Sequence, residues 1–212
     1  MKTKKLNQVT EFSPFGGVRG GIVIINYGAG NIQSVKFAVQ RLGYKAVLSD
    51  NAEEIIKADK VIFPGVGEAS SAMKKLKDAG LDSIIPKLQQ PVLGICLGMQ
   101  LMCKYCEEGN TQGLGIFDVD VVKFQNSEKV PQIGWNQIEN LKSEIFKGIK
   151  DKEYMYLVHS FYVPMNKNTI ATTNYGVNYA SALQKENFYG VQFHPEKSSL
   201  AGEQILKNFL EL

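Results

Sequence analysis

Short apolar segments that alternate with amphipathic segments constrain the fold of this chain more than any other feature of its sequence. Residues 21–25 are apolar and β-branched, and after a turn at 26–31 apolar side chains recur at helical spacing until Gly43. Further strands are expected at 46–48, 60–63 and 92–95, and further helices at 53–58, 70–77 and 97–106. Apolar strands joined by helices are typical of a parallel sheet that is covered on both faces.

The second half of the chain, from about Phe117, is richer in expected strands than in helices. These strands are expected at 119–124, 154–161, 170–173, 180–184 and 189–193, and a last amphipathic helix carries Ile205, Leu206, Phe209 and Leu210. The pattern predicts an α/β fold: a doubly wound, mostly parallel, flavodoxin-like sheet flanked by helices, with a β-rich C-terminal half. Because neither a repeat nor a linker interrupts it, we expect residues 21–212 to form one domain.

Residues 1–20 show neither a helical nor a strand period, and we expect a disordered extension, or one added to the natural chain. The 24 Lys and Arg against 21 Asp and Glu give a net charge of +3, and this excess lies within those residues. The neutral remainder argues against binding to nucleic acid or to an anionic membrane. Three cysteines, no membrane-length apolar run and no apolar signal segment favour a cytoplasmic location.

The strongest chemical signal is Gly94-Ile95-Cys96-Leu97-Gly98, which lies between an apolar strand and an expected helix. A nucleophile on such a sharp turn needs small residues two positions to either side, because larger side chains would collide with the backbone. The helix N-terminus favours a thiolate and leaves backbone N–H groups for an oxyanion. The alternative is a buried structural cysteine flanked by chance glycines.

A cysteine nucleophile needs a base, and the sequence contains two histidines. His194 follows an apolar strand and has Glu196 two residues later, so that His194 can carry the proton while Glu196 orients the imidazole. A surface histidine beside a solvated glutamate is the alternative. His159 also ends an expected strand, and we regard it as the weaker base candidate or as a hydrogen-bonded core histidine.

Two further motifs resemble cofactor sites without completing them. Gly28 and Gly30 suggest a dinucleotide fingerprint, but Gln33 occupies the position of its third glycine. Cys103 and Cys106 form a C-x-x-C pair in an expected helix, without the second pair or the histidine that zinc requires. We therefore expect neither a metal ion nor an organic cofactor.

Six segments together carry a family resemblance. PGVG at 64–67, GICLGMQ at 94–100 and HPEKS at 194–198 resemble the class I (triad) glutamine amidotransferases, and glycines such as those of PGVG let backbone N–H groups approach a ligand. Three more segments resemble the glutaminase subunits of imidazole glycerol phosphate synthase, an enzyme of histidine biosynthesis. They are NYGAGN at 26–31, VPQIGWN at 130–136 and LVHS at 157–160.

The resemblance implies a mechanism and a set of roles. Cys96 would attack the carboxamide of L-glutamine, backbone N–H groups near Val66 and Leu97 would hold the oxyanion, and His194 would protonate the departing ammonia before water hydrolyses the thioester. The residues implied to bind glutamine are Gly65, Gln100, Glu108 and Ser160, with Glu108 pairing the substrate ammonium.

The resemblance also implies a partner, a (β/α)₈ cyclase subunit in a heterodimer. The cyclase would use the ammonia to convert a phosphoribulosyl-formimino carboxamide ribonucleotide into imidazole glycerol phosphate and an aminoimidazole carboxamide ribonucleotide. Asn31, Trp135 and Lys197 would lie toward it. The sequence departs from the family pattern at Gln132, where histidine is usual, and at Phe161, where tyrosine is common.

Two alternatives remain at this level. One is a free-standing cysteine hydrolase of γ-glutamyl compounds, against which the NYGAGN and GWN segments argue. The other is a catalytically inactive regulatory binding protein of the same fold, against which the complete set Cys96, His194 and Glu196 argues.

Overall fold

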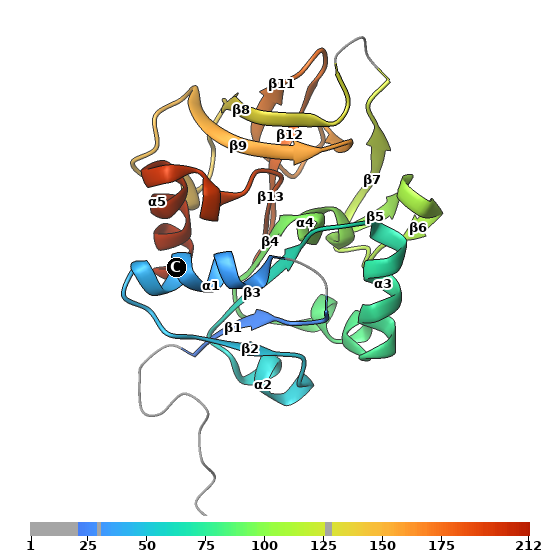
Figure 1. Cartoon of the computed structure of the whole chain (residues 1–212), viewed down its shortest axis with the longest axis vertical. Coiled ribbons are helices and arrows are strands. Elements are labelled where there is room, and N and C mark those ends of the chain that lie inside the picture. Colours follow the sequence, from blue (N-terminus) through green and yellow to red (C-terminus); the bar gives the residue numbers. More distant parts are fainter. Residues whose placement is uncertain (1–20, 29–30, 126–128) are drawn as a thin grey trace, which may run out of the picture.

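A parallel sheet forms the centre of the molecule in the computed structural model, which describes residues 21–28, 31–125 and 129–212. Its strands run in the order β2-β1-β3-β4-β13, and every neighbouring pair in this set is parallel (Figure 1). The strands are β1 (Ile22–Ile25), β2 (Ala46–Ser49), β3 (Lys60–Gly65), β4 (Val92–Cys96) and β13 (Phe188–Val191). The extension expected at residues 1–20 lies outside the described residues.

Helices cover both faces of this sheet, which explains why its strands are apolar throughout. Val23 and Ile25 of β1 belong to the core cluster on one face, whereas Ile22 and Ile24 belong to the cluster on the other. The first cluster includes residues of α2 (Ala52–Lys57), α3 (Ala69–Asp78) and α4 (Leu97–Met102), and the second includes residues of α1 (Ile32–Arg41) and α5 (Ser199–Leu210). The α/β class, the parallel sheet and the flanking helices are therefore as predicted.

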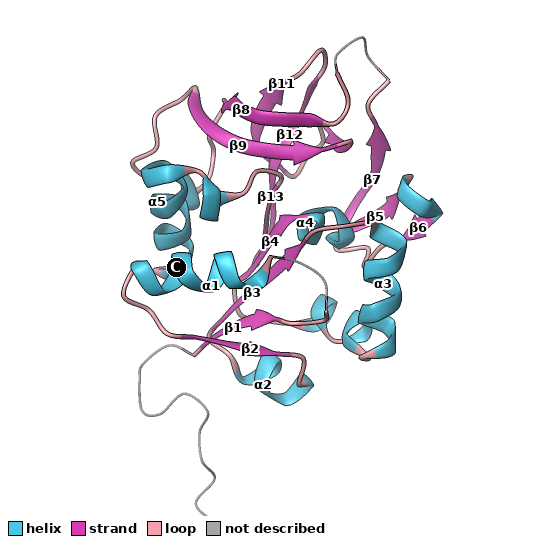
Figure 2. Cartoon of the chain, in the orientation of Figure 1, coloured by secondary structure: helices cyan, strands magenta, loops and turns pink. Residues whose placement is uncertain are grey.

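Beyond β13 the same sheet continues with mostly antiparallel pairing, in the order β13-β12-β10-β7-β5-β6, while β11 pairs with β12 (Figure 2). These strands are β5 (Cys103–Cys106), β6 (Thr111–Gln112), β7 (Phe117–Lys123), β10 (Phe161–Pro164), β11 (Thr169–Asn174) and β12 (Asn178–Lys185). Only β5 and β7 are parallel in this part of the described structure. The β-rich second half was predicted correctly.

A separate antiparallel pair, β8 (Gln132–Ile138) and β9 (Glu153–His159), packs over the central region. The side chains of β8 and β9 alternate between a buried and an exposed side, so Met155 and Leu157 join the core while Trp135 and Tyr154 face outward. Five short 3₁₀ helices connect the described elements: Leu81–Ser83, Ile85–Lys87, Glu108–Asn110, Glu144–Phe146 and Pro195–Lys197. No helix in the described ranges is long and apolar enough to cross a membrane.

Two expectations about local structure were wrong, and one strand was not foreseen. The helix expected at 97–106 ends at Met102, and Cys103–Cys106 is strand β5, because pairing with β6 and β7 overrides the helical pattern. The single strand expected at 154–161 divides at Ser160 into β9 and β10, which pair in different sheets. Strand β8 was not expected, because its polar Gln132 is buried while its apolar Ile133 and Trp135 face outward, which is the reverse of the usual pattern of a half-buried strand.

Candidate active site

The turn that presents Cys96 is tight and conformationally strained. Cys96 ends β4 and precedes α4 with φ 54° and ψ −113°, a backbone region that residues with a side chain rarely adopt. A Cβ atom on Gly98 would overlap the carbonyl oxygen of Phe63, and one on Gly94 would come within 2.9 Å of the Met99 nitrogen. The steric reason expected for the flanking glycines therefore applies at both positions.

His194 and Glu196 form a buried pair beside this turn. β13 lies next to β4 in the sheet, and His194 follows β13 by three residues. The Nδ1 atom of His194 lies 2.9 Å from Oε1 of Glu196, and both side chains are 2% exposed. The backbone on either side is tied down: the His194 N–H donates to the Tyr156 carbonyl (2.9 Å), and the Ser198 hydroxyl donates to the His194 carbonyl (2.7 Å).

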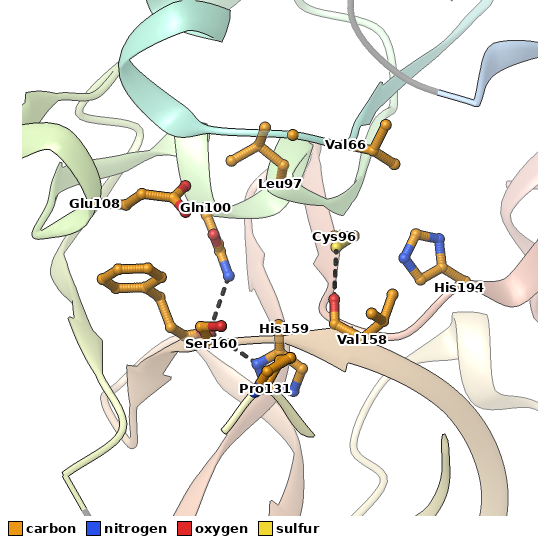
Figure 3. Close-up of a pocket in the computed structure, with 12 residues that line it drawn as sticks. Val66, Cys96, Leu97, Gln100, Glu108, Pro131, Val158, His159, Ser160 and His194 are labelled. Atoms are coloured by element: carbon orange, nitrogen blue, oxygen red, sulfur yellow. Dashed lines mark hydrogen bonds between the residues drawn. The ribbon is translucent and has the colours of Figure 1, made fainter. Parts of the chain in front are cut away.

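The environment of His194 favours its protonated form. Burial by itself would lower the pKa of His194, but interactions with Cys96 and Glu196 outweigh burial and raise the pKa to about 10. The Nε2 atom makes no hydrogen bond within the described part of the chain. Figure 3 shows the imidazole beside Cys96, on the opposite side of the site from Glu108. The ring can therefore hold a proton close to the sulfur.

A cavity of about 280 Å³ opens at Cys96. It is lined by Val66, Gly67, Cys96, Leu97, Gln100, Glu108, Pro131, Val158, His159, Ser160, Phe161 and His194 (Figure 3). Most residues expected at the site meet here. Gly65 does not line the cavity but lies behind its wall, where a Cβ atom would approach the Gly98 nitrogen to 2.8 Å, and Glu196 lies behind His194.

Glu108 places a carboxylate at the end of the cavity away from His194. Its Oε2 atom accepts a hydrogen bond from the Ala69 N–H at the start of α3 (2.8 Å). Burial raises the pKa of Glu108, and the hydrogen bond from Ala69 opposes this shift. The fixed carboxylate can receive a cationic group of a ligand.

Gln100 and Gln192 form a buried amide pair beneath the cysteine. The Gln100 Nε2 atom donates to the Phe161 carbonyl (3.0 Å) and to Oε1 of Gln192 (2.8 Å). The Nε2 atom of Gln192 in turn lies 3.7 Å from the Cys96 sulfur. Sequence reasoning missed Gln192, although it is the one polar residue between the apolar Val191 and Phe193.

His159 is a hydrogen-bonded core histidine. Its Nδ1 atom lies 2.8 Å from the Phe161 carbonyl oxygen and its Nε2 atom 3.2 Å from the Tyr179 hydroxyl. Burial is the main cause that lowers the pKa of His159 to about 4, so the ring is neutral near pH 7. Because both ring nitrogens are occupied, the geometry favours His194 as the base. The neighbouring Gln132 is also buried and lies 3.0 Å from the Tyr179 hydroxyl.

The other two cysteines lie within strand β5 rather than in a helix. Both are buried and unpaired. Burial raises the pKa of the Cys103 thiol well above its usual range and that of Cys106 to about 11. Thiols of this kind are unreactive near neutral pH. Within the described residues, no group of three or more His, Cys, Asp or Glu side chains could hold a metal ion.

The residues expected to face a partner lie outside the cavity. Asn31 is exposed at the start of α1, and Trp135 is 52% exposed on β8. The Lys197 ammonium lies 5.8 Å from the centre of the Tyr156 ring, which also contacts Trp135. The exposed side chains Ile133, Trp135 and Tyr154 form a surface that we call the hairpin face.

Comparisons with known proteins agree with this fold and site. The model of the family "Glutamine amidotransferase class-I" matches residues 23–212. A putative GMP synthase subunit from Thermoplasma acidophilum has a TM-score of 0.70 at 19% identity, over 92% of this chain and 94% of that one. A crystal structure of a glutamine amidotransferase has a TM-score of 0.71 at 18% identity, over 90% and 98%. These two structures show the fold.

Relatives with higher sequence identity show which family within this class the chain belongs to. The imidazole glycerol phosphate synthase subunit HisH of Bacteroides fragilis is 56% identical over 194 residues, which are 90% of this chain and 99% of that protein. The HisH subunits of Bacteroides thetaiotaomicron and Buchnera aphidicola are 52% and 46% identical, with the same coverage. The chain therefore belongs to the HisH family within the class I glutamine amidotransferases.

Proposed function

We propose that this chain is the glutaminase subunit of imidazole glycerol phosphate synthase in histidine biosynthesis, and that it supplies ammonia to a (β/α)₈ cyclase subunit in a heterodimer. The observation that carries the proposal is the placement of Cys96 on a strained turn beside the His194–Glu196 pair, at one end of a cavity whose other end holds Glu108. A nucleophile, a proton carrier with an orienting carboxylate and a carboxylate for the substrate thus share one site.

In the first half-reaction, the Cys96 sulfur adds to the carboxamide carbon of L-glutamine. The carbonyl oxygen becomes an oxyanion, and the backbone N–H groups of Val66 and Leu97 are proposed to stabilise it. When the intermediate collapses, the C–N bond breaks and His194 gives its proton to the nitrogen, which leaves as ammonia. The product on the enzyme is a γ-glutamyl thioester of Cys96.

In the second half-reaction, His194 removes a proton from water, and the resulting hydroxide adds to the thioester carbon. Collapse breaks the C–S bond, so that glutamate leaves and Cys96 returns as a thiolate beside the protonated imidazole. Glu196 holds the imidazole through Nδ1 in both steps, and this leaves Nε2 to exchange the proton with sulfur, nitrogen and water.

The cavity suits glutamine at both of its ends. Glu108 is proposed to pair with the α-ammonium group, while Ser160 and Gln100 line the wall between Glu108 and the nucleophile. Gly65 lies behind the wall of the cavity. Because it has no side chain, β3 can approach Gly98 closely, and this approach brings the Val66 peptide to the reacting carbon. A side chain at position 65 would push this loop away.

The hairpin face is proposed to dock the cyclase, together with Asn31 and Lys197. Its exposed Trp135 and Tyr154 are residue types that are enriched at protein interfaces. The Trp135 ring contacts Tyr156, and Tyr156 contacts His194 with ring centres 6.4 Å apart, so the docking surface is one side chain removed from the base. The three free cysteines support a location in the reducing cytoplasm.

The test is an assay of glutamine hydrolysis by the purified chain, alone and with the cyclase plus its nucleotide substrate. We expect Cys96→Ser to abolish glutamine-dependent synthesis while synthesis from added ammonia persists, because the two chemistries lie on different subunits. Cys103→Ser is the matched control and should retain activity. Full activity of the chain alone on several γ-glutamyl compounds would instead support a free-standing hydrolase, and inactivity under all conditions would support a regulatory binding protein.

A further inference from the structure

We propose that Gln192 donates a hydrogen bond to the Cys96 sulfur that stabilises its thiolate form, and that Gln100 fixes the direction of this bond. The inference rests on the proposed function in assigning Cys96 as the nucleophile. Gln192 is fully buried, and its Nε2 atom lies 3.7 Å from the sulfur. It therefore touches the reacting atom from within the protein interior.

The orientation of the Gln192 amide follows from the Phe161 carbonyl, a group that can only accept hydrogen bonds. The Phe161 carbonyl oxygen lies 3.0 Å from the side-chain amide of Gln100, so Gln100 must turn its NH₂ group toward it. The second hydrogen of that NH₂ group meets Gln192 at 2.8 Å, so Gln192 must present its oxygen there. The Gln192 NH₂ group consequently faces the sulfur. If the Gln192 amide were flipped, its NH₂ group would face the NH₂ group of Gln100, and its oxygen would face the Cys96 sulfur.

The Phe161 carbonyl is itself held in place. It also accepts a hydrogen bond from Nδ1 of His159 (2.8 Å), and the opposite nitrogen of that ring lies 3.2 Å from the Tyr179 hydroxyl. Because His159 is neutral near pH 7 and the Phe161 carbonyl can only accept, the one ring hydrogen lies on Nδ1, while the Tyr179 hydroxyl donates its own hydrogen to Oε1 of Gln132 (3.0 Å). A continuous series of hydrogen bonds thus runs from His159 through Phe161, Gln100 and Gln192 to Cys96.

The second polar neighbour of the sulfur has the opposite preference. The Val158 carbonyl oxygen lies 3.9 Å from the Cys96 sulfur, where it can accept from a thiol but repels a thiolate. Gln192 offsets this repulsion by offering a donor. The titratable side chains that interact with Cys96 are His194, after β13, and Tyr27, at the end of β1. α4 has no titratable residue, and His159 of β9 is neutral. A substitution of Gln192 leaves all of these titratable groups in place.

The test measures the alkylation rate of Cys96 by iodoacetamide as a function of pH, read on the Cys96 peptide by mass spectrometry. Gln192→Met keeps the length of the side chain and removes the donor. We expect the pH midpoint of alkylation to rise by about one unit, and the rate near pH 7 to fall by up to about tenfold. Gln100→Met should give a smaller shift in the same direction, because Gln192 is then free to turn.

Ser181→Ala is the matched control. Ser181 is buried on β12, and its carbonyl accepts from the Gln192 backbone N–H, but its hydroxyl has no hydrogen-bond partner in the described structure. The pH midpoint of Cys96 alkylation in the Ser181→Ala variant should equal that of the unaltered chain. If Gln192→Met is too unstable to assay, Gln100→Met decides alone. A purely structural role for the amide pair would lower the melting temperature without moving the midpoint.

An unshifted midpoint in a folded Gln192→Met or Gln100→Met variant would overturn the proposal. Alkylation involves neither glutamine nor the cyclase, so its outcome is independent of the assay for the proposed function. A shifted midpoint in a chain that fails to hydrolyse glutamine would uphold the Gln192 bond and refute only the glutaminase assignment.

Discussion

The Tyr27 hydroxyl donates a hydrogen bond to the Pro64 carbonyl oxygen, 3.1 Å away, and so joins the end of β1 to the end of β3. Burial, with a smaller contribution from Cys96, raises the pKa of Tyr27 well above its usual range, so the hydroxyl remains a donor at every physiological pH. The peptide that follows, Gly65–Val66, is the proposed source of an oxyanion donor. A side chain that follows the first strand of the fold thus helps to hold the proposed oxyanion peptide at the end of the third.

Tyr27→Phe should lower the catalytic rate more than it weakens glutamine binding. The change leaves the buried Pro64 carbonyl without this donor, which costs about 1–2 kcal/mol of stability, and it loosens the Val66 peptide, which acts on the transition state. Steady-state glutaminase kinetics with the cyclase present would show a lower kcat at similar KM. Tyr44→Phe is the control, since Tyr44 follows α1 and does not line the cavity. Equal loss in both variants would contradict the prediction.

Loss of His194 should be more damaging than loss of the charge on Glu196. His194→Ala removes the proton carrier, whereas Glu196→Gln leaves an imidazole beside Cys96 without its orienting carboxylate. Single acid–base residues contribute about 10²–10⁴-fold to a rate. Glutaminase rates of both variants at saturating glutamine would rank them. The ordering fails if Glu196→Gln loses as much activity as His194→Ala while glutamine still binds.

Stability should decline on the alkaline side because of His194. Its pKa is raised from 6.5 to about 10 in the folded chain, so between these values the folded state holds a proton that the unfolded state has lost. The stabilisation is complete below pH 6.5 and disappears as the pH rises through 10. Melting temperatures between pH 6.5 and 10 should fall more steeply for the unaltered chain than for His194→Gln. Parallel curves for the two proteins would contradict the assignment.

Trp135→Ala should weaken association with the cyclase but leave the isolated chain intact. The side chain is 52% exposed, so its removal should change the stability by less than about 0.5 kcal/mol. A central aromatic residue of an interface is worth about 2 kcal/mol or more, which is over tenfold in affinity. Titration calorimetry with the cyclase measures this loss. Ile56→Ala, at a similarly exposed residue on α2 at the far end of the molecule (Figure 1), should bind normally.

The parts that the sequence predicts well are those set by local pattern. The apolar strands 21–25, 60–63 and 92–95 match β1, β3 and β4 closely, and Cys96 and His194 meet as expected from their places at strand ends. Strands β5 and β8 escaped prediction because their pairing, of β5 with β6 and β7 and of β8 with β9, determines them rather than their own local pattern. For the same reason Gln192 and Tyr27 went unnoticed: a polar side chain's role is set by what it contacts, and only the fold supplies those contacts.

β13 is the last strand of the chain, yet it lies in the interior of the sheet between β4 and β12. During synthesis β4 and β12 are therefore made before β13, the strand that lies between them in the folded sheet. A chain that stops short of residue 188 lacks both the central strand of its sheet and His194, the proposed base. Truncated products can neither finish the core nor release ammonia, so in this architecture the capacity to liberate a reactive product arises only together with a fully assembled fold.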